Sequence, residues 1–210
     1  MNTEVSTFID AEIAKSRAAL EALGNAQYTQ ILANIAHKIE ETLRAGGKVM
    51  FCGNGGSAAD SQHLAAELVG RQNYDRAAAA GLALTVDTSA ITAIGNDYGY
   101  ESVFSRQVEA LGHAGDVLIG ISTSGRSVNV VRALEAAKAK EITTVSFTGG
   151  EARDMAIAEY QLCVPASETA KIQELHITCG HIIFALVERS LFPFGRDSDS
   201  RPVESTVLGA

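Results

Sequence analysis

Apolar and polar positions alternate along the chain in blocks that predict strands and helices in turn. Short, mostly apolar runs predict buried strands at 48–52, 82–86, 117–121, 142–147 and 161–164. Segments with apolar residues at helical spacing predict helices at 3–23, 27–45, 57–70, 89–95, 101–111, 128–140, 151–158 and 170–191. This alternation predicts an α/β fold: a flavodoxin-like three-layer sandwich around a central parallel sheet of about five strands, preceded by N-terminal helices.

The two N-terminal helices are the first of three parts within what we expect to be a single domain. Residues 1–46 carry these helices, 47–192 the sheet with its covering helices, and 193–210 a polar C-terminal tail. Both N-terminal helices are too long and too apolar on one face to be simple appendages. We therefore expect them to pack between subunits.

The composition narrows the classes of function. The chain of 210 residues has a net charge of −8, so it lacks the clustered Lys and Arg of a general nucleic-acid binder. No apolar stretch reaches the roughly 20 residues that span a bilayer, and the N-terminus has no signal-peptide pattern. Cys52, Cys163 and Cys179 lie in apolar contexts without CxxC spacing, which favours buried reduced thiols. We expect a cytoplasmic protein with no nucleic-acid and no membrane partner.

A glycine-rich turn follows the first predicted strand. Gly53-Asn54-Gly55-Gly56 requires glycine-like backbone, and Ser57 is a suitable N-cap for the helix after it. A strand, a glycine turn and a helix N-terminus together expose N–H groups suited to an anion or to sugar oxygens. The spacing matches neither the dinucleotide fingerprint nor a Walker A loop. A tight turn without a ligand is the alternative interpretation.

Candidate metal or acid/base residues lie on two predicted helices. His63 and Glu67 have the i, i+4 spacing that puts imidazole and carboxylate on one helix face. The last helix carries Gln173, Glu174, His176 and His181. Spacing allows either Gln173 or Glu174 beside His181, and ligand chemistry alone prefers the carboxylate of Glu174. Polar residues on a helix surface are the alternative in both cases.

A second polar loop follows the strand at 117–121. Its hydroxyls come from Ser122, Thr123, Ser124 and Ser127. Hydroxyl and N–H groups between a strand and a helix suit a phosphate monoester. An ordinary N-cap cluster is the alternative, but the presence of two such loops favours the phosphate site.

Four segments in this order resemble the phosphoheptose isomerases, a family of sugar-isomerase (SIS) domain proteins: 53–63, 92–100, 122–127, and 171–176 with His181. The resemblance spans about residues 5–192, so 47–192 would be the SIS domain. It implies a homotetrameric isomerase that converts sedoheptulose 7-phosphate to D-glycero-D-manno-heptose 7-phosphate through an enediolate. This reaction is the first step of nucleotide-activated heptose biosynthesis.

The resemblance also implies roles for individual residues. It implies one Zn²⁺ per subunit on His63, Glu67, Gln173 and His181. Isomerisation through an enediolate needs a base and a second proton-transfer group, and we assign Glu67 as the catalytic base and His181 as its acid/base partner. Substrate contacts would fall on Asn54, Gly55, Gly56, Glu67, Asn96, Asp97, Ser122, Thr123, Ser124, Ser127 and Gln173. The resemblance thus selects Gln173, where ligand chemistry alone prefers Glu174.

Two other functions compete with this one. Residues 112–118 and Leu191-Phe192-Pro193 resemble a non-catalytic SIS protein that acts as a scaffold on the bacterial replication initiator. This chain keeps all four implied metal ligands, which favours the enzyme. A SIS isomerase for another sugar phosphate is the third possibility, because hydroxyl contacts in such loops do not encode stereochemistry in a readable way.

Overall fold

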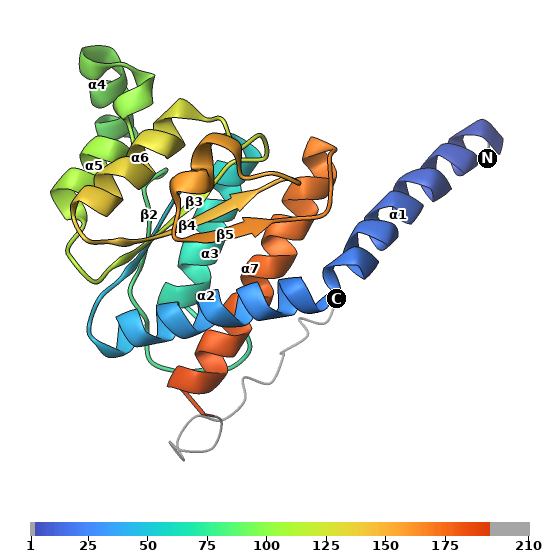
Figure 1. Cartoon of the computed structure of the whole chain (residues 1–210), viewed down its shortest axis with the longest axis horizontal. Helices are drawn as coiled ribbons and strands as arrows, with labels where there is room; N and C mark the ends of the chain where they lie inside the picture. Colours follow the sequence, from blue (N-terminus) through green and yellow to red (C-terminus); the bar gives the residue numbers. More distant parts are fainter. Residues whose placement is uncertain (1–2, 194–210) are drawn as a thin grey trace, which may run out of the picture.

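A five-stranded parallel sheet forms the centre of the molecule (Figure 1). The computed structural model describes residues 3–193, so nearly all of the expected tail 193–210 lies outside the described residues. The strands are β1 (Val49–Gly53), β2 (Gly81–Ala83), β3 (Val117–Ile121), β4 (Thr143–Thr148) and β5 (Tyr160–Cys163), in the order β2-β1-β3-β4-β5. All four neighbouring pairs are parallel, which confirms the predicted fold class.

Helices fill the connections between the strands. The α-helices are α1 (Thr3–Leu23), α2 (Ala26–Arg44), α3 (Gly56–Val69), α4 (Thr88–Tyr98), α5 (Ser105–Leu111), α6 (Val128–Ala139) and α7 (Thr169–Leu191). Two short 3-10 helices, η1 (Tyr100–Ser102) and η2 (Arg153–Ile157), complete the order. Within residues 3–193, no helix is both long and apolar enough to cross a membrane.

Two hydrophobic cores lie on opposite faces of the sheet. Successive strand residues point to opposite faces, so Val49 and Phe51 of β1 join one core while Met50 and Cys52 join the other. Side chains from α2, α3 and α7 complete the first core, and side chains from α5 and α6 complete the second. Strands buried on both faces explain why the sequence shows continuous apolar runs there.

Several element boundaries differ from those predicted. The helix expected at 101–111 is divided into η1 and α5, and the one expected at 151–158 is only the 3-10 helix η2, in which Arg153 has a φ of +49°. Helix α4 continues to Tyr98, through the turn expected at 95–99. Strand β2 ends at Ala83 instead of residue 86, because the chain turns at residues 84–86.

The two N-terminal helices are packed very differently. Helix α2 buries Leu32, Ile35, Ala36 and Ile39 in the first core, whereas α1 buries only Leu23 and projects away from the body (Figure 1). The large apolar residues of α1 are exposed: Val5, Phe8, Ile9, Ile13 and Leu20. The apolar face that the sequence predicts on α1 is therefore uncovered in a single chain.

Candidate active site

The strand order brings the two predicted ligand loops together. In the order β2-β1-β3-β4-β5 the connections from β1 and β3 diverge, which makes the carboxyl ends of these two strands the switch point where such folds bind ligands. Gly53, the last residue of β1, pairs with Ile121, the last residue of β3. The glycine turn and the serine loop therefore leave the sheet side by side.

The glycine turn is built for close contact with α7. Gly55 has a φ of +57° and is the N-cap of α3, which begins at Gly56. The prediction that Ser57 is the N-cap is wrong: Ser57 lies inside the helix and is buried, because the left-handed turn at Gly55 starts the helix earlier. A Cβ at Gly56 would collide with the side-chain amide of Gln173. Gln173 thus packs directly on this turn.

A pair of amides links the glycine turn to the first turn of α6. Asn54 donates to Asn129 and Asn129 donates to Asn54, each over 2.9 Å, and the Tyr100 hydroxyl donates to the same Asn54 oxygen over 3.1 Å. Sequence reasoning missed Asn129 and Tyr100, although an Asn in the first turn after a phosphate-type loop was an available signal. A hollow of about 400 Å³ lies next to the pair, lined by Tyr100, Glu101, Val128, Asn129 and Arg132.

The serine loop gathers hydroxyls at the start of α6. Ser122 and Ser127 share a hydrogen bond of 2.8 Å between their Oγ atoms, and the Ser124 Oγ lies 3.4 Å from that of Ser122. The backbone N–H of Arg126 donates to Ser124 Oγ over 3.2 Å. Converging hydroxyls at the N-terminus of a 12-residue helix favour an oxyanion.

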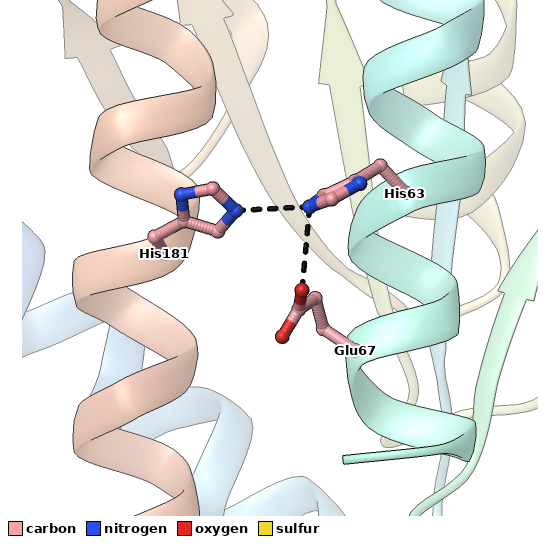
Figure 2. Close-up of side chains that lie close together, drawn as sticks. All are labelled: His63, Glu67 and His181. Carbon is pink, nitrogen blue, oxygen red and sulfur yellow. Dashed lines mark hydrogen bonds and ion pairs between the residues drawn. The ribbon is translucent and has the colours of Figure 1, made fainter. Parts of the chain in front are cut away.

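His63, Glu67 and His181 meet between α3 and α7 (Figure 2). The two imidazoles face each other, with their Nε2 atoms 2.9 Å apart, and His63 Nε2 lies 3.3 Å from Glu67 Oε1. One candidate ligand atom from each residue lies within 4.8 Å of the others. His63 is half-exposed and Glu67 is mostly buried, so the cluster opens toward solvent on one side.

The polar groups in this cluster do not satisfy one another's hydrogen-bonding capacity. Two imidazole Nε2 atoms in contact need one proton between them, since neither can accept from the other without it. Among residues 3–193, the buried Oε2 of Glu67 has no hydrogen-bond partner. Two imidazoles and a carboxylate converging with unused lone pairs are the donor set of a divalent cation, above all Zn²⁺. The residues present therefore fit a metal site.

Known proteins resemble this chain over most of its length. The SIS domain family matches residues 13–149. A phosphoheptose isomerase of Akkermansia muciniphila is 53% identical over 182 residues, covering 82% of this chain and 95% of the relative. One from Roseiflexus is 48% identical and covers 91% and 99%. The chain belongs to the phosphoheptose isomerase family of SIS domain proteins.

Solved structures support the same family. The phosphoheptose isomerase structure from Neisseria gonorrhoeae superposes with a TM-score of 0.82 at 41% identity, covering 88% of this chain and 98% of the other. That from Francisella tularensis gives a TM-score of 0.83 at 33% identity and covers 89% and 99%. The shared architecture therefore extends over almost the whole described chain.

The other two candidates on α7, Glu174 and His176, contact different parts of the molecule. In this member of the phosphoheptose isomerase family, the Glu174 carboxylate accepts from Ser16 of α1 over 2.8 Å and from Lys171 of α7 itself over 3.0 Å. His176 is fully buried and contacts the Thr148 carbonyl over 3.0 Å. Burial lowers the pKa of His176 to about 4, so it is a neutral core residue.

The sequence analysis selected Asn96 and Asp97 as substrate contacts but did not select Asp60. Asn96 and Asp97 are exposed in the last turn of α4, where Asn96 donates to Asp97 over 2.7 Å. Their predicted substrate contacts stay predictions. Asp60 was not selected, although it precedes His63 by one turn of α3. Burial raises the pKa of Asp60 to about 6 against the opposing effect of His63, and its Oδ2 has no partner within the described chain.

Proposed function

We propose that this chain is an aldose–ketose isomerase that converts sedoheptulose 7-phosphate to D-glycero-D-manno-heptose 7-phosphate. The observation that carries the proposal is the convergence of His63, Glu67 and His181, whose hydrogen-bonding groups do not satisfy one another. It occurs in a chain with 53% identity to a phosphoheptose isomerase. The product would feed the biosynthesis of nucleotide-activated heptoses.

We assign His63, Glu67, Gln173 and His181 as ligands of one Zn²⁺ per subunit. The convergence of three donor atoms within 4.8 Å supports the first, second and fourth ligands. Gln173 is assigned by family resemblance alone. Its amide contacts Gly56, which lies roughly 10 Å from His63 along the axis of α3, so it is not among the three converging donors. When bound, Zn²⁺ supplies Lewis acidity that polarises the substrate carbonyl.

Glu67 and His181 carry the proton transfers. Glu67 takes the proton from C1 of the ketose, and the C1–H electrons form the C1–C2 double bond of the enediolate. His181 moves the hydroxyl proton from O1 to O2. Glu67, after exchange of its proton with water, delivers a proton to C2, which leaves the aldehyde at C1. The candidate ligand atoms of Glu67 and His181 lie within 4.8 Å of each other, which supports their action on one substrate.

The two loops provide substrate binding. The hydroxyls of Ser122, Thr123, Ser124 and Ser127 hold the 7-phosphate at the N-terminus of α6. The sugar hydroxyls are bound by Asn54, Gly55, Gly56, Asn96, Asp97 and Gln173, together with Glu67. Binding energy from the remote phosphate then orients C1 and C2 at the cluster.

We further propose that the protein is a cytoplasmic homotetramer. The exposed apolar face of α1 supports association, because an apolar helix face of this length is unfavourable in water. Free thiols at Cys52, Cys163 and Cys179 are compatible with a reducing compartment. Light scattering at micromolar concentration tests the assembly, and a monomer would contradict it.

Incubation of the full chain with sedoheptulose 7-phosphate, followed by NMR, tests the activity. We expect conversion that a chelator abolishes and added Zn²⁺ restores, with about one zinc per subunit by elemental analysis. A folded chain that holds no metal and converts no sugar phosphate would contradict the proposal and favour the scaffold function. Conversion of a different sugar phosphate alone would leave the chemistry and change the substrate.

A further inference from the structure

The segment between α3 and β2 is fastened to α7 by a buried ion pair. Arg76 Nε lies 3.1 Å from Glu188 Oε1, and the side chains of Arg76 and Glu188 are only 4% and 1% exposed. Neither charge reaches water, so the pair requires hydrogen bonds on its remaining polar atoms. Most of the partners that meet this requirement are backbone groups at the end of α3 and just after it, and one of them is the carbonyl of Glu67.

All nitrogens of the Arg76 guanidinium are engaged. Apart from Glu188, they donate to backbone carbonyls at the end of α3 and in the segment after it: Glu67, Leu68, Gly70 and Ala77, over 2.6–3.0 Å. The shortest of these bonds, at 2.6 Å, goes to the carbonyl of Glu67, the proposed base. Arg76 therefore holds the backbone of the base directly.

The same segment also contacts the backbone of the acid/base partner. The Gln72 side-chain amide donates to the His181 carbonyl over 3.0 Å, while its backbone N–H donates to Glu188 over 3.0 Å. The Gln72 Oε1 is buried and has no partner among the residues that the structure describes. A buried acceptor without a partner is unfavourable, because it loses its hydrogen bonds to water and gains none. The orientation that reaches His181 is thus kept at an energetic disadvantage.

We propose that Arg76, Gln72 and Glu188 form a positioning unit that fixes the backbone of Glu67 relative to that of His181 across the gap between α3 and α7. The proposal rests on the proposed function, since it assumes that Glu67 and His181 act together. Arg76 and Gln72 are positioning residues, because their side chains bond to the backbone carbonyls of Glu67 and His181 and not to the side chains of these residues.

The geometry of the cluster explains why such a unit is needed. His63 and Glu67 are on α3 and His181 is on α7, so the Nε2–Nε2 separation of 2.9 Å depends on the spacing of two helices. Displacement of a catalytic group by about 1 Å can lower a rate by about a hundredfold. Outer groups that orient metal ligands typically affect metal affinity or activity by about 10–100-fold.

Two substitutions test the unit. Arg76→Lys keeps a cation beside Glu188, but one ammonium cannot replace donors on three nitrogens, so the bond to the Glu67 carbonyl is lost. Gln72→Leu removes the bond to His181 together with the unpartnered Oε1, so we expect the melting temperature to stay equal or rise. In both variants we expect Zn²⁺ affinity, measured by chelator competition, to fall by about tenfold. We expect kcat to fall by about 10–100-fold with KM within twofold.

A matched control comes from the opposite edge of the sheet. Lys48 Nζ lies 2.6 Å from Asp116 Oδ2, and the Asp116 side chain is 3% exposed, so this is a second, largely buried ion pair. Both residues precede their strands, away from the carboxyl edge. Lys48→Met should lower the melting temperature and leave Zn²⁺ affinity and kcat at wild-type values.

Imidazole chemical shifts in the metal-free protein keep this test independent of activity. We expect the ring resonances of His63 and His181 to move in Arg76→Lys and Gln72→Leu and to stay in place in Lys48→Met. Unchanged ring shifts with unchanged Zn²⁺ affinity in both variants would overturn the positioning unit. A wild-type chain inactive on sedoheptulose 7-phosphate would instead overturn the proposed function, and the shift comparison would still decide the positioning claim.

Discussion

Helix α7 carries two polar sites, two turns apart, at Glu188 and at His181. They differ in how fully their hydrogen-bonding groups find partners within the chain. At Glu188 the carboxylate accepts from two backbone N–H groups, one amide and Arg76. At His181 an imidazole faces another imidazole, and the nearby Glu67 Oε2 has no partner within residues 3–193. The first site is complete within the chain, because both oxygens of the Glu188 carboxylate accept hydrogen bonds. The second is incomplete, because one oxygen of Glu67 has no donor among the described residues.

The pKa of Glu188 follows from its complete set of hydrogen-bond donors. Burial alone would raise the pKa of this carboxyl, but hydrogen bonds from Gln72, Asn73 and Arg76 outweigh it, so the pKa lies below its ordinary value. The carboxylate is therefore a stable charge with a structural use. Glu67 differs from it, because the buried Oε2 of Glu67 has no donor among residues 3–193.

The largest effect is expected where the incomplete site is altered. Glu67→Gln preserves shape and removes basicity, so we expect kcat to fall at least about a thousandfold, with an unchanged melting temperature. The matched control is Glu174→Gln on α7, which should keep wild-type turnover. Steady-state kinetics decide the point: turnover above a tenth of wild type in Glu67→Gln would exclude Glu67 as the base.

Breaking the complete site should reduce stability instead. Glu188→Ala leaves the buried Arg76 without its counter-charge, and we expect a loss of about 3–5 kcal/mol in the free energy of unfolding. Urea denaturation measures this loss. The double variant Arg76→Met with Glu188→Leu should recover part of it, because no buried charge remains. A single variant within 1 kcal/mol of wild type would refute the assignment.

A third polar residue of α7, His176, should make stability depend on pH. Its folded pKa is about 4 against 6.5 in the unfolded chain, so the unfolded state binds more protons between these values. This contribution to stability is full above about pH 6.5 and is lost as pH falls toward 4, by about 3 kcal/mol in total at about 1.4 kcal/mol per pKa unit. His176→Gln should flatten the profile from urea melts between pH 4 and 7, and an unchanged slope would contradict this account.

The smallest effect is expected at Glu174. Its contacts with Ser16 and Lys171 are at the surface, so Glu174→Ala should cost at most about 1 kcal/mol. Bound zinc should stay nearly unchanged, whereas Gln173→Ala and His181→Ala should lower zinc content or activity by orders of magnitude. Elemental analysis of the three variants distinguishes the two ligand sets. Zinc lost in Glu174→Ala and retained in Gln173→Ala would reverse the assignment.

Local patterns in the sequence were sufficient for much of this fold. The strands that end at Gly53 and Ile121 are apolar on both faces, so their runs identify them and the loops that follow. The i, i+4 pair of His63 and Glu67 is equally local. Boundaries failed where backbone conformation decides, as at Gly55, whose positive φ starts α3 before Ser57.

Contacts between distant segments were beyond such reasoning. Arg76 and Glu188 are 112 residues apart, and either charge alone is indistinguishable from a solvated surface residue. The direction of Glu174 was equally hidden, because spacing on one helix does not tell which neighbour each face meets. Only the packing of α1 and α3 against α7 determines which side chains enter the site.

The most direct measurement of the central claim follows the proton. Sedoheptulose 7-phosphate is incubated in D₂O with the zinc-loaded full chain and, in parallel, with Glu67→Gln, and the products are analysed by NMR. We expect the wild type to form the aldose with solvent deuterium at C2, because Glu67 exchanges its proton with water during enediolate formation. We expect Glu67→Gln to form neither product nor deuterated ketose. Product without deuterium at C2, formed by both proteins at similar rates, would contradict the account.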